Sequence, residues 1–322
     1  MSASAWRRAR LALIFAATSV LPAVAADAFP VTVANCGVEV TLAAAPERLM
    51  VVNNDDLSLL GALDALPLVV ARTTEPQDGL YDAATKAAIA AIPQIATETG
   101  ATGGAVIALE KILEVAPDLL LAPESAADRQ QLAAAGIALY SPPAYCTDTA
   151  YIPGGTASFE RVYEQLATFG QLLGRSELAA QRIAELKAEV EALAAQPAQG
   201  TAVAIYVAGG GKTLYPYGAR SMVTPVFAAA GLENVYADRD ERVFEASVED
   251  LLGKDPGTIV LLYDGGAPED VVAAFLTAAG VDSLSAVKAG RIVPLEFSFT
   301  DPPSPLSIKG ATELAARLKA LK

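Results

Sequence analysis

The chain has 322 residues, of which 53% are hydrophobic, and a formal net charge of −14 at pH 7. So acidic a protein does not bind nucleic acid through a general basic surface and should not adhere to anionic lipid. The chain contains no histidine, which excludes a Ser-His-Asp hydrolase, a histidine-ligated zinc site and a histidine-ligated haem.

Residues 1–25 are predicted to be a cleavable signal peptide. A start with three arginines is followed by an apolar stretch of ten residues, 11–20, and Ala23-Val24-Ala25 matches the small-x-small cleavage rule. Ten apolar residues are too few to cross a bilayer as a helix; the alternative is an uncleaved membrane anchor. Removing the three arginines takes the net charge from −14 to −17 and leaves about 297 residues, enough for two lobes with a core each.

Residues 26–157 are predicted to form an N-terminal lobe. Residues 31–33 and 38–42 alternate around Asn35-Cys36-Gly37, which predicts a hairpin. The unbroken apolar run 49–52 is typical of a strand in a parallel sheet. Helices and strands are then expected in alternation, at residues 57–66, 68–71, 107–115, 119–122, 127–135 and 137–140. This alternation favours βα units on a parallel sheet.

Residues 158–174 are predicted to be a connecting helix, because apolar side chains recur there at helical spacing. A second, charged helix is expected at 177–195. The C-terminal lobe, 175–322, is expected to contain the following strands and helices: 202–207, 221–230, 248–252, 259–263, 270–279, 291–296 and 307–321. The predicted fold class is therefore α/β, with two lobes, each a mainly parallel sheet flanked by helices, joined by one long helix.

One helix–proline–strand pattern occurs twice. Residues 109–121 and 248–260 align with a shift of 139 positions, which places Glu110 on Glu249 and Pro117 on Pro256. Copies so far apart indicate two similar lobes rather than a solenoid, and paired lobes commonly bind a ligand between them. A glutamate on a helix surface is ordinarily just solvated, but its equivalent placement in both lobes raises the idea of symmetric contact points for a two-fold partner.

The chain has two cysteines, Cys36 and Cys146. In an exported protein we expect them to be oxidised to one disulfide; the alternative is a pair of buried free thiols. The bridge would close a loop of about 110 residues and contribute about 4–5 kcal/mol on a chain-entropy basis. It would tie the first strand to a loop late in the N-terminal lobe.

Candidate ligand contacts follow the predicted strands. Asp55 lies beyond a strand's carboxyl end, where α/β sheets place ligands, although helix capping is the plainer interpretation of Asp55 and Asp56. Tyrosine offers stacking area with a polar end, and arginine can clamp anionic oxygens. Such side chains gather in three loop regions: Tyr140, Tyr145 and Tyr151; Tyr215, Tyr217 and Arg220; Phe297 and Phe299. Ordinary packing is the alternative for each.

The order and spacing of several segments resemble the substrate-binding proteins of iron–siderophore and cobalamin ABC importers, the class III proteins with a rigid helix between lobes. The resemblance covers nearly all of the mature chain. The matching segments are Pro46-Glu47-Arg48, Leu109-Glu110-Lys111-Ile112 through Pro117-Asp118-Leu119, Gly170-Gln171-Leu172-Leu173-Gly174, Gly231-Leu232-Glu233-Asn234-Val235, Ser247-Val248-Glu249-Asp250-Leu251 through Asp255-Pro256, and Ala286-Val287-Lys288-Ala289-Gly290-Arg291-Ile292.

This resemblance implies a ligand in a shallow cleft between the lobes and delivery to a membrane permease with paired ATPases. It implies that Glu110 and Glu249 dock onto permease arginines, and it supports the Cys36–Cys146 disulfide. Arginines and aromatic residues of the cleft would contact an iron chelate. The ligand-binding candidates are Asp55, Arg72, Tyr145, Tyr151, Tyr217, Arg220 and Phe297. The related zinc and manganese binders use histidines that this chain lacks, so we expect no metal site.

The sequence therefore predicts a periplasmic, monomeric solute-binding protein with no catalytic residues and no resident cofactor. It would capture a ferric siderophore or similar iron chelate and deliver it to an ABC importer permease, without binding nucleic acid. A cobalamin or other corrinoid is the alternative ligand. An exported α/β enzyme is a further alternative, but without histidine its nucleophile and base would have to come from carboxylates and lysine.

Overall fold

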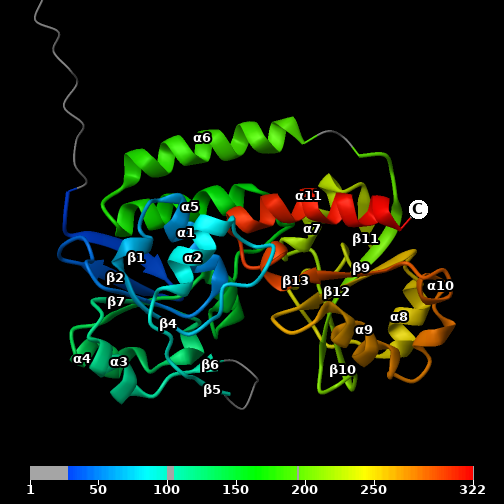
Figure 1. Cartoon of the computed structure of the whole chain (residues 1–322), viewed down its shortest axis with the longest axis horizontal. Helices are drawn as coiled ribbons and strands as arrows, with labels where there is room; N and C mark the ends of the chain where they lie inside the picture. The colour runs from blue at the N-terminus through cyan, green and yellow to red at the C-terminus, as the bar shows by residue number, and fades with distance from the viewer. Residues whose placement is uncertain (1–27, 100–104, 194–195, 322) are drawn as a thin grey trace, which may run out of the picture.

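The computed structural model describes residues 28–99, 105–193 and 196–321, which form two α/β lobes (Figure 1). Each lobe contains a mainly parallel sheet flanked by helices, which confirms the predicted fold class. The predicted signal peptide, residues 1–25, lies outside the described residues. No helix among the described residues is long and apolar enough to cross a membrane.

The N-terminal lobe is built on four parallel strands in the order β4-β3-β7-β8. These strands are β3 (Leu49–Val51), β4 (Val69–Arg72), β7 (Leu119–Leu121) and β8 (Ala138–Tyr140). The central strands β3 and β7 bury every residue, which accounts for their unbroken apolar runs. Leu49 and Leu119 pack toward α1, α2 and α5, whereas Met50 and Leu120 pack toward α3 and α4.

Short helices and two antiparallel strand pairs complete this lobe. The helices are α1 (Asn54–Ala62), α2 (Ala83–Ala90), α3 (Leu109–Val115) and α4 (Arg129–Ala134), with 3-10 turns at Leu66–Leu68, Glu124–Ala126, Pro143–Tyr145 and Thr149–Tyr151. The strand pairs are β1 (Val31–Asn35) with β2 (Val38–Leu42) and β5 (Glu98–Thr99) with β6 (Ala105–Val106).

The predicted hairpin is confirmed as β1–β2. Its two turn residues, Cys36 and Gly37, both have positive φ, 50° and 80°, as two-residue hairpin turns require. The ring of Tyr151 lies against Gly37, so that a Cβ there would be 2.5 Å from it and would require this exposed side chain to move.

The C-terminal lobe has a five-stranded sheet in the order β10-β9-β12-β13, with β11 also paired to β9. All its pairings are parallel except β10 with β9. The strands are β9 (Gly200–Ala208), β10 (Thr213–Pro216), β11 (Leu232–Asn234), β12 (Thr258–Tyr263) and β13 (Ile292–Glu296). The helices are α7 (Val223–Ala229), α8 (Val248–Lys254), α9 (Pro268–Leu276), α10 (Ser285–Lys288) and α11 (Pro305–Ala320), with 3-10 turns at Val281–Ser283 and Phe297–Phe299.

The repeated sequence unit is repeated in structure. Ala116 caps the C-terminus of helix α3 and Asp255 that of helix α8, and both are left-handed residues, with φ of 49° and 36°. A proline follows each, and β7 and β12 begin at Leu119 and Thr258, so the shift of 139 positions is kept through helix, turn and strand. A proline cannot continue a helix, and a left-handed residue before it turns the chain toward the sheet.

Two helices form the segment between the lobes. The predicted connecting helix, 158–174, is observed as α5 (Glu160–Leu172), and α6 (Ser176–Ala192) packs along it (Figure 1). Because α5 contributes Leu166 and Phe169 to the N-terminal core, it is α6 that leads the chain on to β9. The lobe boundaries at 157 and 175 stay predictions.

The last helix, α11, touches both lobes. It packs on α7 in its own lobe and on α1 of the N-terminal lobe. Lys309 on α11 donates hydrogen bonds to the carbonyl oxygens of Gly79 and Leu80, at 2.6 and 3.1 Å. Leu80 itself is buried in a C-terminal core cluster. The loop before α2 therefore anchors one lobe to the other.

Candidate functional site

A cavity of about 310 Å³ lies where strands of both lobes end. The residues that follow β3 and β4 line it from the N-terminal lobe. The residues that follow β12 and β13 line it from the C-terminal lobe. Its lining residues are Val52, Asn53, Asn54, Asp55, Thr73, Thr74, Thr97, Ala105, Pro123, Tyr145, Asp264, Phe297 and Ser298. The carboxyl ends of parallel strands are where open α/β sheets bind ligands. We call this space the cleft cavity.

Asp55 lies at the cavity because it comes shortly after a strand that ends there. Strand β3 is buried on both faces and ends at Val51, and α1 begins at Asn54, so Asp55 falls in the first helical turn. There Asp55 is 2% exposed, and its Oδ2 atom has no hydrogen-bond partner. The helix cap is Asn53 rather than an aspartate, and its side chain makes no capping hydrogen bond. The capping interpretation of Asp55 therefore does not describe this helix.

Burial raises the pKa of Asp55 to about 8, with a further rise from the charges of Asp301 and Asp264 and an opposing effect of Arg242. Asp56, fully buried with neither carboxyl oxygen hydrogen-bonded, also has a pKa well above its usual range because of burial and the charge of Asp55. An unpaired buried carboxylate is costly. Burial therefore favours the protonated form of both side chains in the unliganded protein.

The cavity also has an aromatic ring from each lobe. Phe297, directly after β13, lines it from the C-terminal lobe and has Tyr206 at 6.1 Å and Tyr217 at 6.3 Å between ring centroids. Tyr145 lines it from the N-terminal lobe. The lining thus combines amide, hydroxyl and carboxyl groups with two ring faces. Such a mixture suits an organic ligand with an apolar body and polar groups.

Arg242 is a residue that sequence reasoning missed. It forms an ion pair with Asp301, and its guanidinium lies over the ring of Tyr145 at 5.4 Å from the centroid. The two charged side chains are 14% and 1% exposed. Burial alone would lower the pKa of Arg242, but the charge of Asp301 outweighs it and raises that pKa. The pair is separated by a long stretch of chain and lies in loops without periodicity, so no sequence pattern points to it.

Three of the predicted ligand contacts line the cavity, namely Asp55, Tyr145 and Phe297, and Tyr217 packs beside Phe297. Three others are placed elsewhere. Arg72 is buried and donates to the carbonyl oxygens of Ile89 and Thr74, at 3.0 and 2.6 Å. Arg220 forms a two-pronged pair with Asp240, at 2.8 Å for each hydrogen bond.

Tyr151, the third residue placed elsewhere, is 49% exposed and lies against Gly37 of the β1–β2 hairpin. It is absent from the described lining of the cleft cavity. Tyr151 is close to Tyr145 in sequence, but the loop turns back onto the hairpin after Tyr145. Tyr151 therefore lies away from the ligand site.

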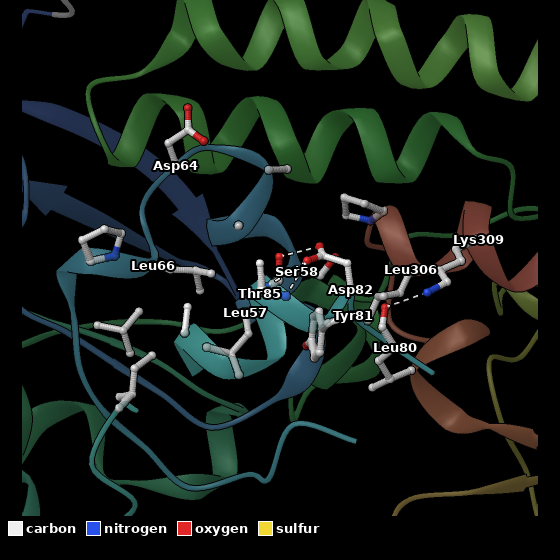
Figure 2. Close-up of a pocket in the computed structure, with 18 of the residues that line it drawn as sticks. Leu57, Ser58, Asp64, Leu66, Leu80, Tyr81, Asp82, Thr85, Leu306 and Lys309 are labelled. Carbon is white, nitrogen blue, oxygen red and sulfur yellow. Dashed lines mark hydrogen bonds between the residues drawn. The ribbon is translucent and has the colours of Figure 1, made fainter. Parts of the chain in front are cut away.

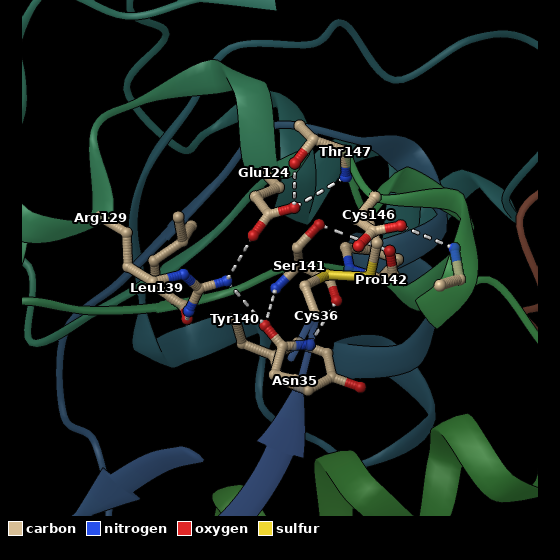
Figure 3. The surroundings of a disulfide bond; sticks show 12 residues. Asn35, Cys36, Glu124, Arg129, Leu139, Tyr140, Ser141, Pro142, Cys146 and Thr147 are labelled. Atoms are coloured by element: carbon tan, nitrogen blue, oxygen red, sulfur yellow. Dashed lines mark hydrogen bonds and ion pairs between the residues drawn. A yellow bond between two sulfur atoms is a disulfide. The ribbon is translucent and has the colours of Figure 1, made fainter. Parts of the chain in front are cut away.

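The predicted disulfide between Cys36 and Cys146 is formed (Figure 3). Beside it, Asn35 Nδ2 donates to the carbonyl oxygen of Ser141 at 2.7 Å, and Ser141 N donates to Asn35 Oδ1 at 3.0 Å. Because Cys146 follows Tyr145 directly, these bonds fix the loop that brings Tyr145 to the cavity.

A larger hollow of about 1020 Å³ lies among α1, α2 and the start of α11 (Figure 2). Its surface is mostly apolar, with Leu57, Leu66 and Leu306 among its lining residues, and Lys309 closes one end. It shares no lining residue with the cleft cavity and lies along helices rather than at strand ends. Its position therefore does not fit the usual ligand site of an α/β sheet.

The repeated glutamates occupy equivalent places. Glu110 lies in the first turn of α3 and Glu249 in the first turn of α8, and both are exposed. Neither lines the cleft cavity. Two acids displayed at matching positions of the two lobes are available to a partner outside the cleft.

Two lobes joined through helices, with a cavity at the strand ends between them, define the class III periplasmic binding protein fold. The chain belongs to the periplasmic binding protein family, whose sequence model matches residues 50–298. The proteins of this family are solute-binding proteins of the periplasm that work with ABC importer permeases. No curated protein sequence matches the chain.

Solved structures agree with this assignment. A protein of an ABC-type Fe³⁺-hydroxamate transport system from Saccharomonospora viridis is 38% identical, with a TM-score of 0.79 over 90% of this chain and 99% of that chain. A periplasmic haem-binding protein from Pseudomonas aeruginosa is 21% identical, with a TM-score of 0.67 over 86% and 94%. The vitamin B12 binding protein of Vibrio cholerae is 16% identical, with a TM-score of 0.58 over 86% and 98%. The last two share the fold alone.

Proposed function

We propose that the protein captures a ferric siderophore or a similar iron chelate in the cleft cavity and hands it to the permease of an ABC importer. The observation that carries this proposal is the cavity itself, which lies at the strand ends of both lobes and combines polar groups with the rings of Tyr145 and Phe297. The similarity to a protein of a Fe³⁺-hydroxamate transport system supports the choice of an iron chelate. In this proposal residues 1–25 are removed on export, and the mature protein is a monomer that performs no covalent chemistry.

Titration of the mature protein with ferric chelates tests the ligand. The single tryptophan of the chain, Trp6, lies within the predicted signal peptide, so the emission of the mature protein comes from tyrosines. Because Tyr145 lines the cavity and Tyr206 and Tyr217 flank Phe297, a bound ferric chelate should quench this emission. Cyanocobalamin and haemin are titrated in parallel by calorimetry. If cyanocobalamin or haemin binds saturably and no ferric chelate binds, the proposed ligand is wrong.

We further propose that Glu110 and Glu249 are the docking points for the permease. Changing both to alanine should leave chelate binding intact and abolish uptake in cells that carry the importer. The matched control changes Glu177 and Glu233, two exposed glutamates on α6 and β11. Unchanged uptake by the Glu110→Ala/Glu249→Ala protein, or equal loss in the control, would refute the docking role.

A further inference from the structure

We infer that the cleft cavity selects iron chelates that carry a positively charged group, and that Asp55 and Asp264 receive that group. This inference rests on the proposed function and names the class of chelate. Its basis is the set of side chains that the two lobes present to the cavity.

Each lobe contributes one carboxyl group to the lining. Asp55 comes from the N-terminal lobe, is almost fully buried, and leaves its Oδ2 without a hydrogen-bond partner. Asp264 comes from the end of β12, is exposed, and accepts a hydrogen bond from Gln77 Nε2 at 2.6 Å. Once Asp55 ionises beside a cation, this buried oxygen that the protein leaves unsatisfied is an acceptor for the ligand's donor.

No lysine or arginine belongs to the cavity's lining among the described residues. The arginines around it are occupied by the protein. Arg242 pairs with Asp301, and Arg220 pairs with Asp240. Arg161 donates to the carbonyl oxygens of Arg220, Pro153, Gly154 and Gly155. A chelate with carboxylate or catecholate charge would therefore meet acids without a guanidinium ready to receive it.

The aromatic rings of the cavity also favour a positively charged ligand. Ring faces attract cations through their quadrupole, and Tyr145 and Phe297 both line the space. Tyr145 already has the guanidinium of Arg242 over its ring. Phe297, by contrast, packs only against other rings among its described aromatic and cation contacts, so it remains available to a cationic ligand.

Several charged or titratable groups face Asp55 and set how it responds to such a ligand. They are Asp56 and Tyr81 in its own lobe, Tyr145 beside it, and Asp264, Asp301 and Arg242 from the C-terminal lobe. Asp264 and Asp301 outnumber the single base, Arg242, even when Asp55 and Asp56 hold their protons, so the potential at the cavity favours a cation. A cation bound beside Asp55 stabilises its ionised form, and binding therefore releases a proton.

Two forms of one chelate test the inference directly. Ferrioxamine B is a trihydroxamate complex with a pendant ammonium group, and its N-acetylated form is the same complex without that charge. Calorimetry at pH 7 should show the charged form binding about tenfold tighter, equivalent to about 1.4 kcal/mol. The affinity for the charged form should rise from pH 6 to pH 8 with proton release, whereas that for the acetylated form should not rise.

The variant Asp264→Asn should remove most of the preference for the charged form. The matched control is Asp282→Asn, which deletes the same charge at an exposed position outside the cavity lining and should keep the preference. Equal affinities of wild-type protein for the two forms would overturn the inference while leaving the proposed function intact. Tighter binding of an anionic ferric triscatecholate would overturn it as well. Failure to bind any iron chelate would instead defeat the proposed function.

Discussion

The two copies of the helix–proline–strand unit share a backbone turn but hold it by different side chains. In the N-terminal copy, Arg48 donates to the carbonyl oxygens of Ala116 and Val115, at 2.9 and 2.6 Å, to cover the end of α3. In the C-terminal copy, Asp255 in the turn itself accepts two hydrogen bonds from Ser285, at 2.9 and 2.7 Å. The geometry is repeated and the chemistry is not, so each lobe can be altered separately.

The same contrast holds around the cleft. The N-terminal lobe has a disulfide and two buried aspartates without a basic partner, whereas the buried acids of the C-terminal lobe, Asp301 and Glu296, are matched by Arg242 and Arg317. The lobes therefore differ in what stabilises them and in how they respond to pH. The predictions that follow test this difference.

The largest expected effect comes from the disulfide, which only the N-terminal lobe possesses among the described residues. The variant Cys36→Ser/Cys146→Ser should lose about 4–5 kcal/mol of unfolding free energy on a chain-entropy basis, measured by urea unfolding. Wild-type protein with a reductant should reach the same midpoint, and the reductant should not move the midpoint of the variant. A loss below about 1 kcal/mol would show that the hydrogen bonds between Asn35 and Ser141 hold the loop without the bridge.

The buried ion pair of the C-terminal lobe should be nearly as sensitive. The variant Asp301→Asn leaves Arg242 buried without a counter-charge and should lose about 3 kcal/mol of unfolding free energy. The double variant Arg242→Met/Asp301→Asn removes both charges and should recover most of that loss. If the double variant were as unstable as the single one, packing rather than charge would explain the effect.

The buried aspartates should make stability fall as pH rises. The pKa of Asp56 is raised in the folded state, so the native protein keeps a proton that the unfolded chain releases above about pH 4. Native stability should therefore decline from there upward, by about 1.4 kcal/mol per pH unit for this group. In the variant Asp56→Asn the slope from pH 5 upward should be shallower, as followed by urea unfolding. Asp282→Asn, at an exposed site, should keep the wild-type slope.

The smallest expected effect distinguishes the two helix ends. Ala116 has a left-handed backbone that disfavours any Cβ, so Ala116→Gly should raise the unfolding free energy by about 1 kcal/mol. Asp255→Gly relieves similar backbone strain but loses both hydrogen bonds to Ser285, so its gain should be smaller or reversed. Thermal unfolding of the two variants measures this difference. Equal increases in stability would mean that the hydrogen bonds of Ser285 do not stabilise the turn.

Much of the fold could be predicted because its signals are local or repeated. The apolar runs of β3 and β7 predict a buried parallel sheet, and the spacing of Pro117 and Pro256 predicts two lobes. The disulfide followed from compartment and cysteine count.

The candidate site could be predicted only in part. Phe297 directly follows β13 and Asp55 lies four residues after the end of β3, and position relative to a strand end is visible in sequence. Arg72 is the last residue of β4, where the direction of a side chain depends on packing against α2, and it turns inward rather than to the cavity. Arg242 and Asp301 are far apart in sequence and are brought together by the fold of the C-terminal lobe. Their pairing could therefore not be predicted from a local sequence pattern.

The contact between α1 and α11 ties the order of synthesis to the assembly of the cleft. Helix α1 belongs to the first lobe to be made, and its partner α11 is the last helix of the described residues. Until α11 has been synthesised, the flank of α1 stays uncovered, and Lys309 is not yet present to hold the loop at Gly79. The mutual placement of the lobes is therefore fixed only once α11 has been made, so a nascent or truncated polypeptide that lacks it cannot present an assembled cleft to its ligand.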